Sequence, residues 1–425
     1  MWMEALRVWR RRSRSLALLL GAAVITACAE DLSGGAACPA LCPGRSLVVR
    51  DTVLDAVVFD TVVTRATSIG SEAVFPFASR GDTLDTRIIL RFDSLPTRVT
   101  RNGGDSAITA IDSAYVLLRL SASTSRFSAP VRIDLYDVDT TAADTTEAAV
   151  LALFRPDRLL GGSTLDTNQV KDSLRVYFDN ARLLAKITGA GRLRVGLRLT
   201  STKNALLSIG ALNGAQSALL KFDPVPSDTA IKEIVVALRS TSPTNNVELQ
   251  NDLQDYLLVA AAPPLPGIDV LSIGGLPARR TFLRFEIPRV ILDSATVLRA
   301  TLLLTQRSNR LLLPTDSILI LPQVVTAGEE VTDFARASSL LSVFPVDTLR
   351  LVPGDSGVKV VEVAAALRQW NSVVNVFRQQ RALVIRSSDE GETPAEVQFY
   401  SVRAASSLRP RLRVSYALRT TFGIP

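Results

Sequence analysis

Alternation of apolar and polar residues with a period of two is the feature of this sequence that most restricts its fold. It runs through residues 131–138, 193–199 and 411–416. In an extended strand successive side chains point to opposite faces, so one face meets a core and the other meets water. Similar short runs recur along the chain, separated by Asp, Ser, Gly and Pro. The pattern predicts an all-β protein with antiparallel sheets, arranged as sandwiches or barrels.

Two blocks of the sequence occur twice, in the same order. Residues 87–93 match residues 280–286 around a shared Leu-Arg-Phe, and residues 112–116 match residues 293–297 around a shared Asp-Ser-Ala. The two blocks lie 12 residues further apart in the first copy, which predicts a loop insertion near residues 101–104.

The repeated blocks indicate an internal duplication. We expect two tandem β-sandwich domains, at residues 47–226 and 231–418, each large enough to bury its own core. We also expect a few short helices. Val363, Leu367 and Trp370 recur at helical spacing, which predicts a helix with Trp370 in the core, and residues 179–184 are its counterpart in the first copy.

Residues 1–27 have the composition of an export signal. Five arginines precede an apolar run at residues 16–24, which is too short to remain as a membrane span of ~20 residues. The run ends in the sequence Ile25-Thr26-Ala27-Cys28.

This ending resembles the lipobox of a bacterial lipoprotein signal. The resemblance implies that the mature chain starts at Cys28 and that acyl chains on this residue anchor it to a membrane. Ala29 follows, where an Asp would oppose sorting to the outer membrane, so we expect outer-membrane anchoring, with the periplasmic or surface face left open. The alternative is an ordinary secreted protein that is cleaved near Ala27.

The segment after the anchor is small and polar, with Gly34-Gly35 and two prolines. Residues 28–46 therefore read as a flexible tether. Cys38 and Cys42 lie within it and would form a local disulfide in an oxidising compartment, or remain as two reduced thiols. A zinc site is not expected, because such sites use four Cys or His ligands and the chain has no His.

The charge pattern argues against a nucleic-acid partner. The formal net charge is +7, but residues 1–27 carry five Arg and one Glu, so the rest of the chain has a net charge of only +3. The basic residues are interleaved with Asp and Glu along the strands and form no basic stripe.

The residues also argue against an enzyme. Without His, the usual nucleophile triads and metal hydrolases lack their base or ligand, and no phosphate-binding loop is present. Paired carboxylates could hydrolyse glycosides without His, and Asp389, Glu390 and Glu392 are the candidates. However, Asp-Glu-Gly-Glu is also typical of a hairpin turn, so we expect no catalytic site.

Five residues are candidates for facing a ligand or a cation. Asp134, Asp137 and Asp139 lie in an acidic stretch that would either hold calcium, which binds six to eight oxygens, or simply be solvated. Arg91 and Arg284 each lie between a Leu and a Phe, so we expect them to face outward or toward the other domain. There they would pair with the acidic residue two positions later or meet a ligand.

The second copy, from residue 280 to residue 416, resembles the DNRLRE-type domains of secreted bacterial proteins. The resemblance is carried by the Leu-Arg-Phe and Ser-Ala-x-Val blocks, the helix ending in Trp370, residues 382–390 and residues 399–401. The first copy lacks the Trp and the Arg-x-Ser-Asp-Glu segment. Those domains are jelly-roll sandwiches grouped with carbohydrate-binding modules.

The resemblance implies a non-enzymatic binding or adhesion protein with polysaccharide as its ligand. The alternative is a structural spacer or assembly component whose partners are envelope proteins.

Overall fold

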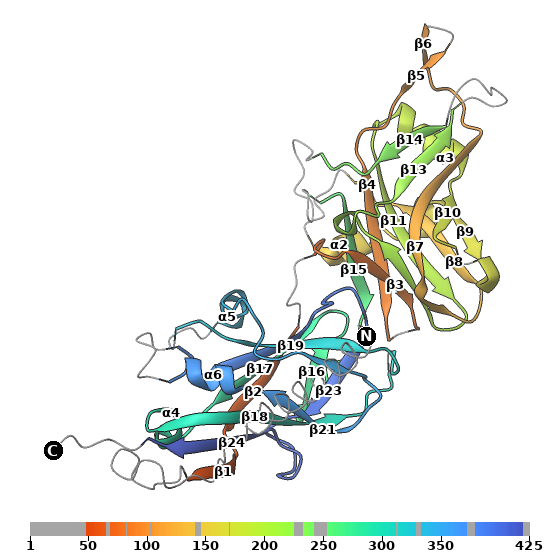
Figure 1. The fold of residues 1–425 in the computed structure, drawn as a ribbon. Helices are drawn as coiled ribbons and strands as arrows, with labels where there is room; N and C mark the ends of the chain where they lie inside the picture. The colour runs from red at the N-terminus through yellow and green to blue at the C-terminus, as the bar shows by residue number, and fades with distance from the viewer. Residues whose placement is uncertain are drawn as a thin grey trace, which may run out of the picture. The chain divides into compact units, whose positions relative to one another are not determined.

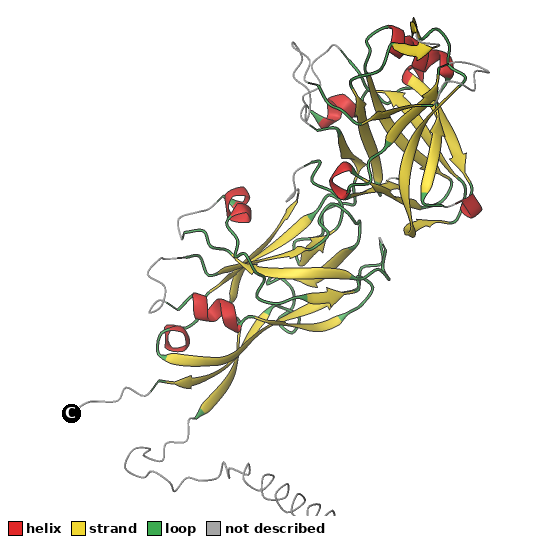
Figure 2. Cartoon of the chain, turned by 45° about the horizontal axis from the view of Figure 1, so that its top comes forward, coloured by secondary structure: helices red, strands yellow, loops and turns green. Residues whose placement is uncertain are grey.

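A computed structural model confirms an all-β fold with two large antiparallel sheets and a few short helices. Figure 2 shows that strands make up most of both sandwiches. The structure describes residues 48–64, 69–81, 83–101, 104–140, 146–169, 171–224, 233–241, 253–311, 313–328, 333–371 and 379–419.

The first sandwich has eleven strands (Figure 1). They are β3 (Val74–Ser79), β4 (Asp85–Phe92), β7 (Ser113–Phe127), β8 (Val131–Asp137), β9 (Leu159–Leu165), β10 (Ser173–Tyr177), β11 (Leu193–Ser201), β12 (Ala205–Gly210), β13 (Leu219–Asp223), β14 (Ile234–Ala237) and β15 (Asp255–Ala261).

These strands form two layers around one core. In one layer β4 pairs with β15 and β11, and β8 and β9 extend it. In the other, β7 pairs with β10, β12 and β13, and β3 and β14 extend it. The chain passes between the layers where Ser79 pairs with Asp85. Ile88, Leu90 and Phe92 of β4 are buried in the core, so the odd-numbered residues of this strand face outward.

The second sandwich also has eleven strands. They are β1 (Val49–Leu54), β2 (Val57–Thr64), β16 (Val270–Gly274), β17 (Arg279–Phe285), β18 (Ala295–Arg307), β19 (Ile318–Val324), β20 (Leu349–Leu351), β21 (Gly357–Glu362), β22 (Ala382–Ser387), β23 (Glu396–Tyr400) and β24 (Arg411–Leu418).

The two sheets have the same strand order. Reading from β14 to β9 in the first and from β1 to β20 in the second gives equivalent strands at every step, with β4 and β17 carrying the repeated Leu-Arg-Phe. β17 pairs with β2 and β22, as β4 pairs with β15 and β11. One element has no counterpart: the hairpin of β5 (Arg98–Arg101) and β6 (Gly104–Ala107) lies where the spacing of the repeat predicts an insertion.

The helices are short and lie between strands. They are α2 (Glu147–Leu151), α3 (Asn180–Thr188), α4 (Arg289–Leu292), α5 (Phe334–Ser339), α6 (Ala364–Gln369) and the 3₁₀ turns η1 (Pro156–Arg158), η2 (Thr167–Gln169) and η3 (Leu212–Gly214). Asp179 caps α3 by accepting hydrogen bonds from the backbone N–H groups of Ala181 and Arg182. Trp370 at the end of α6 is buried, with its ring 5.3 Å from that of Phe285. The predicted helices and the core position of Trp370 are therefore present.

The predicted domain boundaries do not follow the strand pairing. β1 and β2, which fall in the first predicted copy, lie in the second sandwich, where β1 is next to β24 and β2 pairs with β17. β14 and β15, which fall in the second predicted copy, pair with β13 and β4 of the first sandwich. The two repeats thus exchange their first two strands. Alternation identifies strands but does not specify their partners, which is why the sequence did not indicate this exchange.

Two of the exchanged strands, β2 and β15, each supply a buried carboxylate at the same register position. Asp60 of β2 and Asp255 of β15 lie opposite the Leu of the repeated Leu-Arg-Phe. Asp60 accepts a hydrogen bond from the backbone N–H of Val402 at 2.7 Å, and Asp255 accepts one from that of Leu212 at 2.8 Å. Burial raises the pKa of both carboxyl groups, against the opposing effect of these hydrogen bonds.

The exchange predicts the effect of deleting residues 48–64. The deletion removes β1 and β2, so β17 loses a pairing partner and the second core loses Ala56 and Val57. We expect the second sandwich to unfold while the first, whose strands are all intact, stays folded. Limited proteolysis with mass spectrometry should then show protection only across residues 69–261, whereas deletion of residues 1–47 should leave both sandwiches protected. Protection of residues 270–418 in the first variant would contradict the exchange.

A second prediction concerns pH. Because folding raises the pKa of Asp60 and Asp255, both bind protons more tightly in the folded chain. Their stabilising contribution is full below the ordinary Asp pKa of about 4 and is lost as the pH rises through the raised values. The double variant Asp60→Asn, Asp255→Asn keeps an acceptor oxygen without the charge. Its free energy of unfolding in urea should equal that of the wild type at about pH 3 and exceed it at about pH 7.

The matched control for this experiment is substitution of the same residues by Ala. Ala removes the same charge but leaves the N–H groups of Val402 and Leu212 without their acceptor, so each Ala should be about 1–3 kcal/mol less stable than Asn at the same position, at both pH values. An Asn variant less stable than the wild type at neutral pH would contradict the assignment.

Candidate functional site

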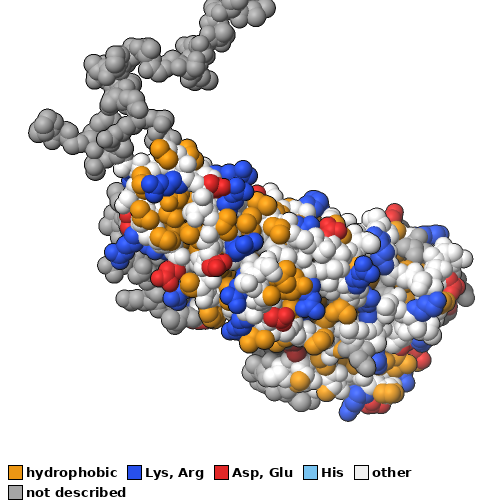
Figure 3. Space-filling view, turned by 90° about the horizontal axis from the view of Figure 1, so that it is seen from below, with side chains coloured by type: hydrophobic (Ala, Val, Ile, Leu, Met, Phe, Trp, Pro, Cys, Tyr) orange, Lys and Arg blue, Asp and Glu red, His pale blue; other side chains and the backbone are white. Residues whose placement is uncertain are grey.

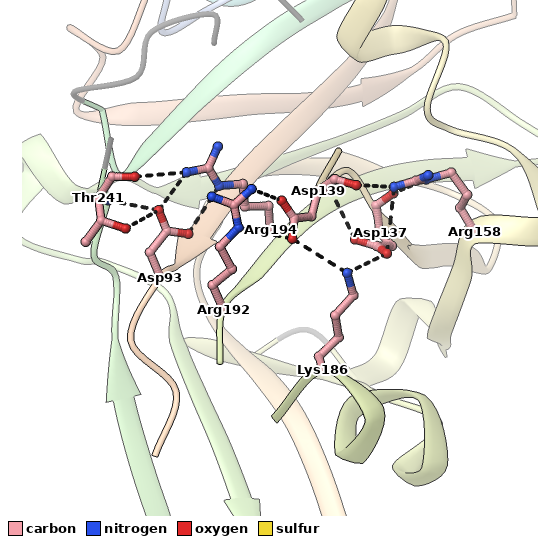
Figure 4. Close-up of polar contacts among 8 residues, drawn as sticks. All are labelled: Asp93, Asp137, Asp139, Arg158, Lys186, Arg192, Arg194 and Thr241. Carbon is pink, nitrogen blue, oxygen red and sulfur yellow. Dashed lines mark hydrogen bonds and ion pairs between the residues drawn. The ribbon is translucent and has the colours of Figure 1, made fainter. Parts of the chain in front are cut away.

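A charged cluster at one end of the first sandwich contains two of the predicted site residues (Figure 4). Asp137 ends β8 and Asp139 follows it, while Lys186 comes from α3. The Lys186 ammonium lies 2.7 Å from Asp137 and 3.7 Å from Asp139. Arg192, just before β11, pairs with Asp139, and Arg158 of η1 donates to the backbone carbonyls of both aspartates.

A second ion pair in the same sandwich is buried. The Arg194 guanidinium binds both carboxylate oxygens of Asp93, at 2.7 and 3.2 Å, and both side chains are at most 3% exposed. The backbone N–H of Thr241 also donates to Asp93, at 2.8 Å. This pair closes the end of β4 beside the charged cluster.

These contacts neutralise the carboxylates that the sequence offered as calcium ligands. Asp137 and Asp139 face three cations, and Asp134 pairs instead with Arg132 at 2.7 Å. Within the described ranges, no group of three or more Asp, Glu, Cys or His side chains could hold a metal ion. The acidic stretch is thus an ion-pair network, and the calcium hypothesis has no support in this arrangement.

Arg91 lies on the outer face of β4, as its place between Leu90 and Phe92 predicts, but it does not meet solvent. Only 2% of the residue is exposed. It donates to the backbone carbonyl of Leu253 at 2.9 Å, and its guanidinium lies 5.2 Å from the ring centroid of Tyr256. The physical reason is a second apolar cluster, which includes Ile89 and Tyr256 and covers this face.

Arg284, at the equivalent position of β17, is exposed and lines an open recess of about 860 Å³. Arg289 at the start of α4 and Arg381 just before β22 line the same recess, together with Asp55 and Glu286. Among the described residues, no hydrogen bond or ion pair engages the three guanidinium groups. The recess therefore presents three available cations.

The three candidate carboxylates lie in one connection of the second sandwich, where an arginine binds one of them. Asp389, Glu390 and Glu392 lie in a turn-rich connection from β22 to β23. This connection joins the two layers, because β22 pairs with β17 and β19 while β23 pairs with β16 and β18, so it is not a hairpin tip. Glu390 is bound by Arg280 at 2.6 and 2.7 Å.

The sequence did not identify Arg289, Arg381 or Asp55 as site residues. They come from three separate segments, and no spacing links them to Arg284. The only signal would have been the differences between the two repeats around Leu-Arg-Phe.

Cys28, Cys38 and Cys42 lie outside the described residues. Among the described residues, no helix is long and apolar enough to cross a membrane.

Basic and acidic side chains are interspersed on the face drawn in Figure 3, with apolar side chains between them. No continuous basic stripe is visible on this face.

Comparisons with known proteins identify no relative. No family model and no curated protein matches the sequence. Among solved structures, the T13 IBDV viral particle aligns over 89% of this chain and 77% of that chain, with 11% identity and a TM-score of 0.14. The infectious bursal disease virus VP2 subviral particle aligns over 86% and 78%, with 10% identity and a TM-score of 0.12. Scores this low establish no shared fold.

The buried pair yields a stability prediction. Replacing Arg194 with Met leaves the Asp93 carboxylate buried without its guanidinium, which should cost about 3–5 kcal/mol in the free energy of unfolding. The matched control is Arg132→Met, which removes a more exposed pair and should cost less than about 1 kcal/mol. Urea unfolding measures both, and equal effects would contradict the structural role of Arg194.

Proposed function

We propose that this protein is a lipid-anchored, non-enzymatic component of the bacterial outer membrane whose second sandwich binds a polysaccharide. The observation that carries the proposal is the recess beside Arg284, an open cavity with a mainly polar lining. Its volume is in the range of about 300–1,000 Å³ that is typical of ligand pockets.

The second sandwich is the better candidate for binding. At the equivalent end of the first sandwich, Arg91 is covered by Tyr256 and Asp93 is sealed by Arg194. The second sandwich also carries the part of the sequence that resembles a carbohydrate-binding domain. Both observations favour one ligand site per chain.

The anchor is supported by the sequence of residues 1–28. Replacing Cys28 with Ser removes the thiol that would carry lipid, and cleavage by the corresponding peptidase should fail with it. We expect the mature wild-type protein to fractionate with membranes and to carry acyl chains on Cys28 by mass spectrometry. Cys38→Ser should behave as the wild type. A wild-type N-terminus without lipid would contradict the anchor.

Binding is tested on a panel of immobilised polysaccharides with the full-length protein in detergent. We expect at least one polymer to bind the wild type. Arg284→Glu, which reverses one charge of the recess, should reduce that binding roughly tenfold or more, a change of about 1.4 kcal/mol or more. Thr296→Glu, which adds the same charge at an exposed position of β18, is the matched control and should bind as the wild type. No binding to any polymer would contradict the proposal.

A specific observation also favours a protein partner as a second candidate. β21 pairs with β18, and its Val358 and Val360 are 58% and 48% exposed. Because β21 pairs with β18 alone among the described strands, it is an edge strand, and exposed apolar side chains on an edge strand are suited to contact with another protein. Val358→Glu, Val360→Glu would then abolish association with an envelope protein and leave polysaccharide binding intact.

A further inference from the structure

The recess differs from the equivalent place in the first sandwich in which charged side chains it contains. Pairing registers make Arg284 equivalent to Arg91, and Ala382 equivalent to Arg194. Glu286 follows Phe285 as Asp93 follows Phe92. The second sandwich thus keeps the Arg and the acidic residue but lacks the second Arg that neutralises Asp93.

The cover over the arginine also differs. In the first sandwich Tyr256, which pairs with Ile89, places its ring against Arg91. The equivalent residue of β2 is Thr61, which pairs with Phe282 and has no ring. The Arg284 guanidinium is consequently left exposed at the recess.

The net positive charge and the residues of the lining indicate which class of ligand the recess fits. Three guanidinium groups face the recess against two carboxylates, those of Asp55 and Glu286. A guanidinium binds a carboxylate or sulfate through two parallel hydrogen bonds, which gives both strength and orientation. The aromatic residue of the lining is Phe285, which is only 4% exposed, so its ring offers no open face on which a neutral sugar could stack.

We propose that the recess binds an acidic polysaccharide, one whose sugars carry carboxylate groups, through Arg284, Arg289 and Arg381. The inference rests on the proposed polysaccharide function and specifies its ligand class. Recognition depends on ion pairing, so binding falls as the salt concentration rises. Asp55 belongs to the exchanged N-terminal segment, so the site is complete only when β1 and β2 are in place.

The experiment measures binding of the full-length protein in detergent to polygalacturonate, with dextran as a neutral polymer and free sulfate as a competitor. We expect the wild type to bind polygalacturonate and not dextran, with sulfate competing only at far higher charge concentration than the polymer. Arg284→Ala, Arg381→Ala should weaken binding roughly tenfold or more, because the variant keeps only one of the three guanidinium groups that pair with the carboxylates. Arg284→Lys, Arg381→Lys should weaken it less.

The matched control is Arg307→Ala, Arg310→Ala, which removes two exposed cations of the second sandwich that do not line the recess. Equal losses in the two Ala variants would show non-specific charge attraction and overturn the site. Binding of dextran that depends on the recess would overturn the acidic ligand class while retaining the proposed function. If the protein binds neither of these polymers and no other polymer on the panel, both the acidic ligand class and the proposed polysaccharide function would be overturned. Circular dichroism verifies that each variant is folded.

Discussion

The pairing of β2 with β17 and of β15 with β4 is the constraint on which the rest of the structure depends. Each of these contacts joins segments that belong to different repeats of the sequence. Neither sandwich is completed by its own repeat, because each takes two strands from the other. Each sandwich therefore depends on residues from both repeats of the sequence, although each has its own core.

The exchange also accounts for how the two sandwiches differ at equivalent places. The exchanged strands bring different side chains to the same position, Tyr256 in one case and Thr61 in the other. One arginine is buried under a ring and the other is left at an open recess. Two differences therefore distinguish the closed end of the first sandwich from the open recess of the second. One is the side chain that the exchanged strand supplies, and the other is Ala382 at the position where the first sandwich has Arg194.

Local patterns in the sequence predict the strands at residues 131–138, 193–199 and 411–416, observed as β8, β11 and β24, and one helix in each repeat. Period-two alternation and helical spacing depend on neighbours in the chain, so they identify the strands, α3 and α6 with Trp370. They do not identify partners that are some 200 residues away, so the exchange was missed. The burial of Arg91 was missed for a related reason, because the cluster that covers it is assembled from several segments. The recess was missed because its arginines share no spacing.

The placement of β1 beside β24 has a consequence for the order in which the chain folds. The first strand of the described residues has no neighbour in its sheet until the last strand, β24, is available. Contacts between such distant segments form slowly, because a long loop must close first. The first sandwich can form as soon as residue 261 is available, while residues 49–64 still have no partner. An early strand that stays unpaired for this long is a natural substrate for chaperones.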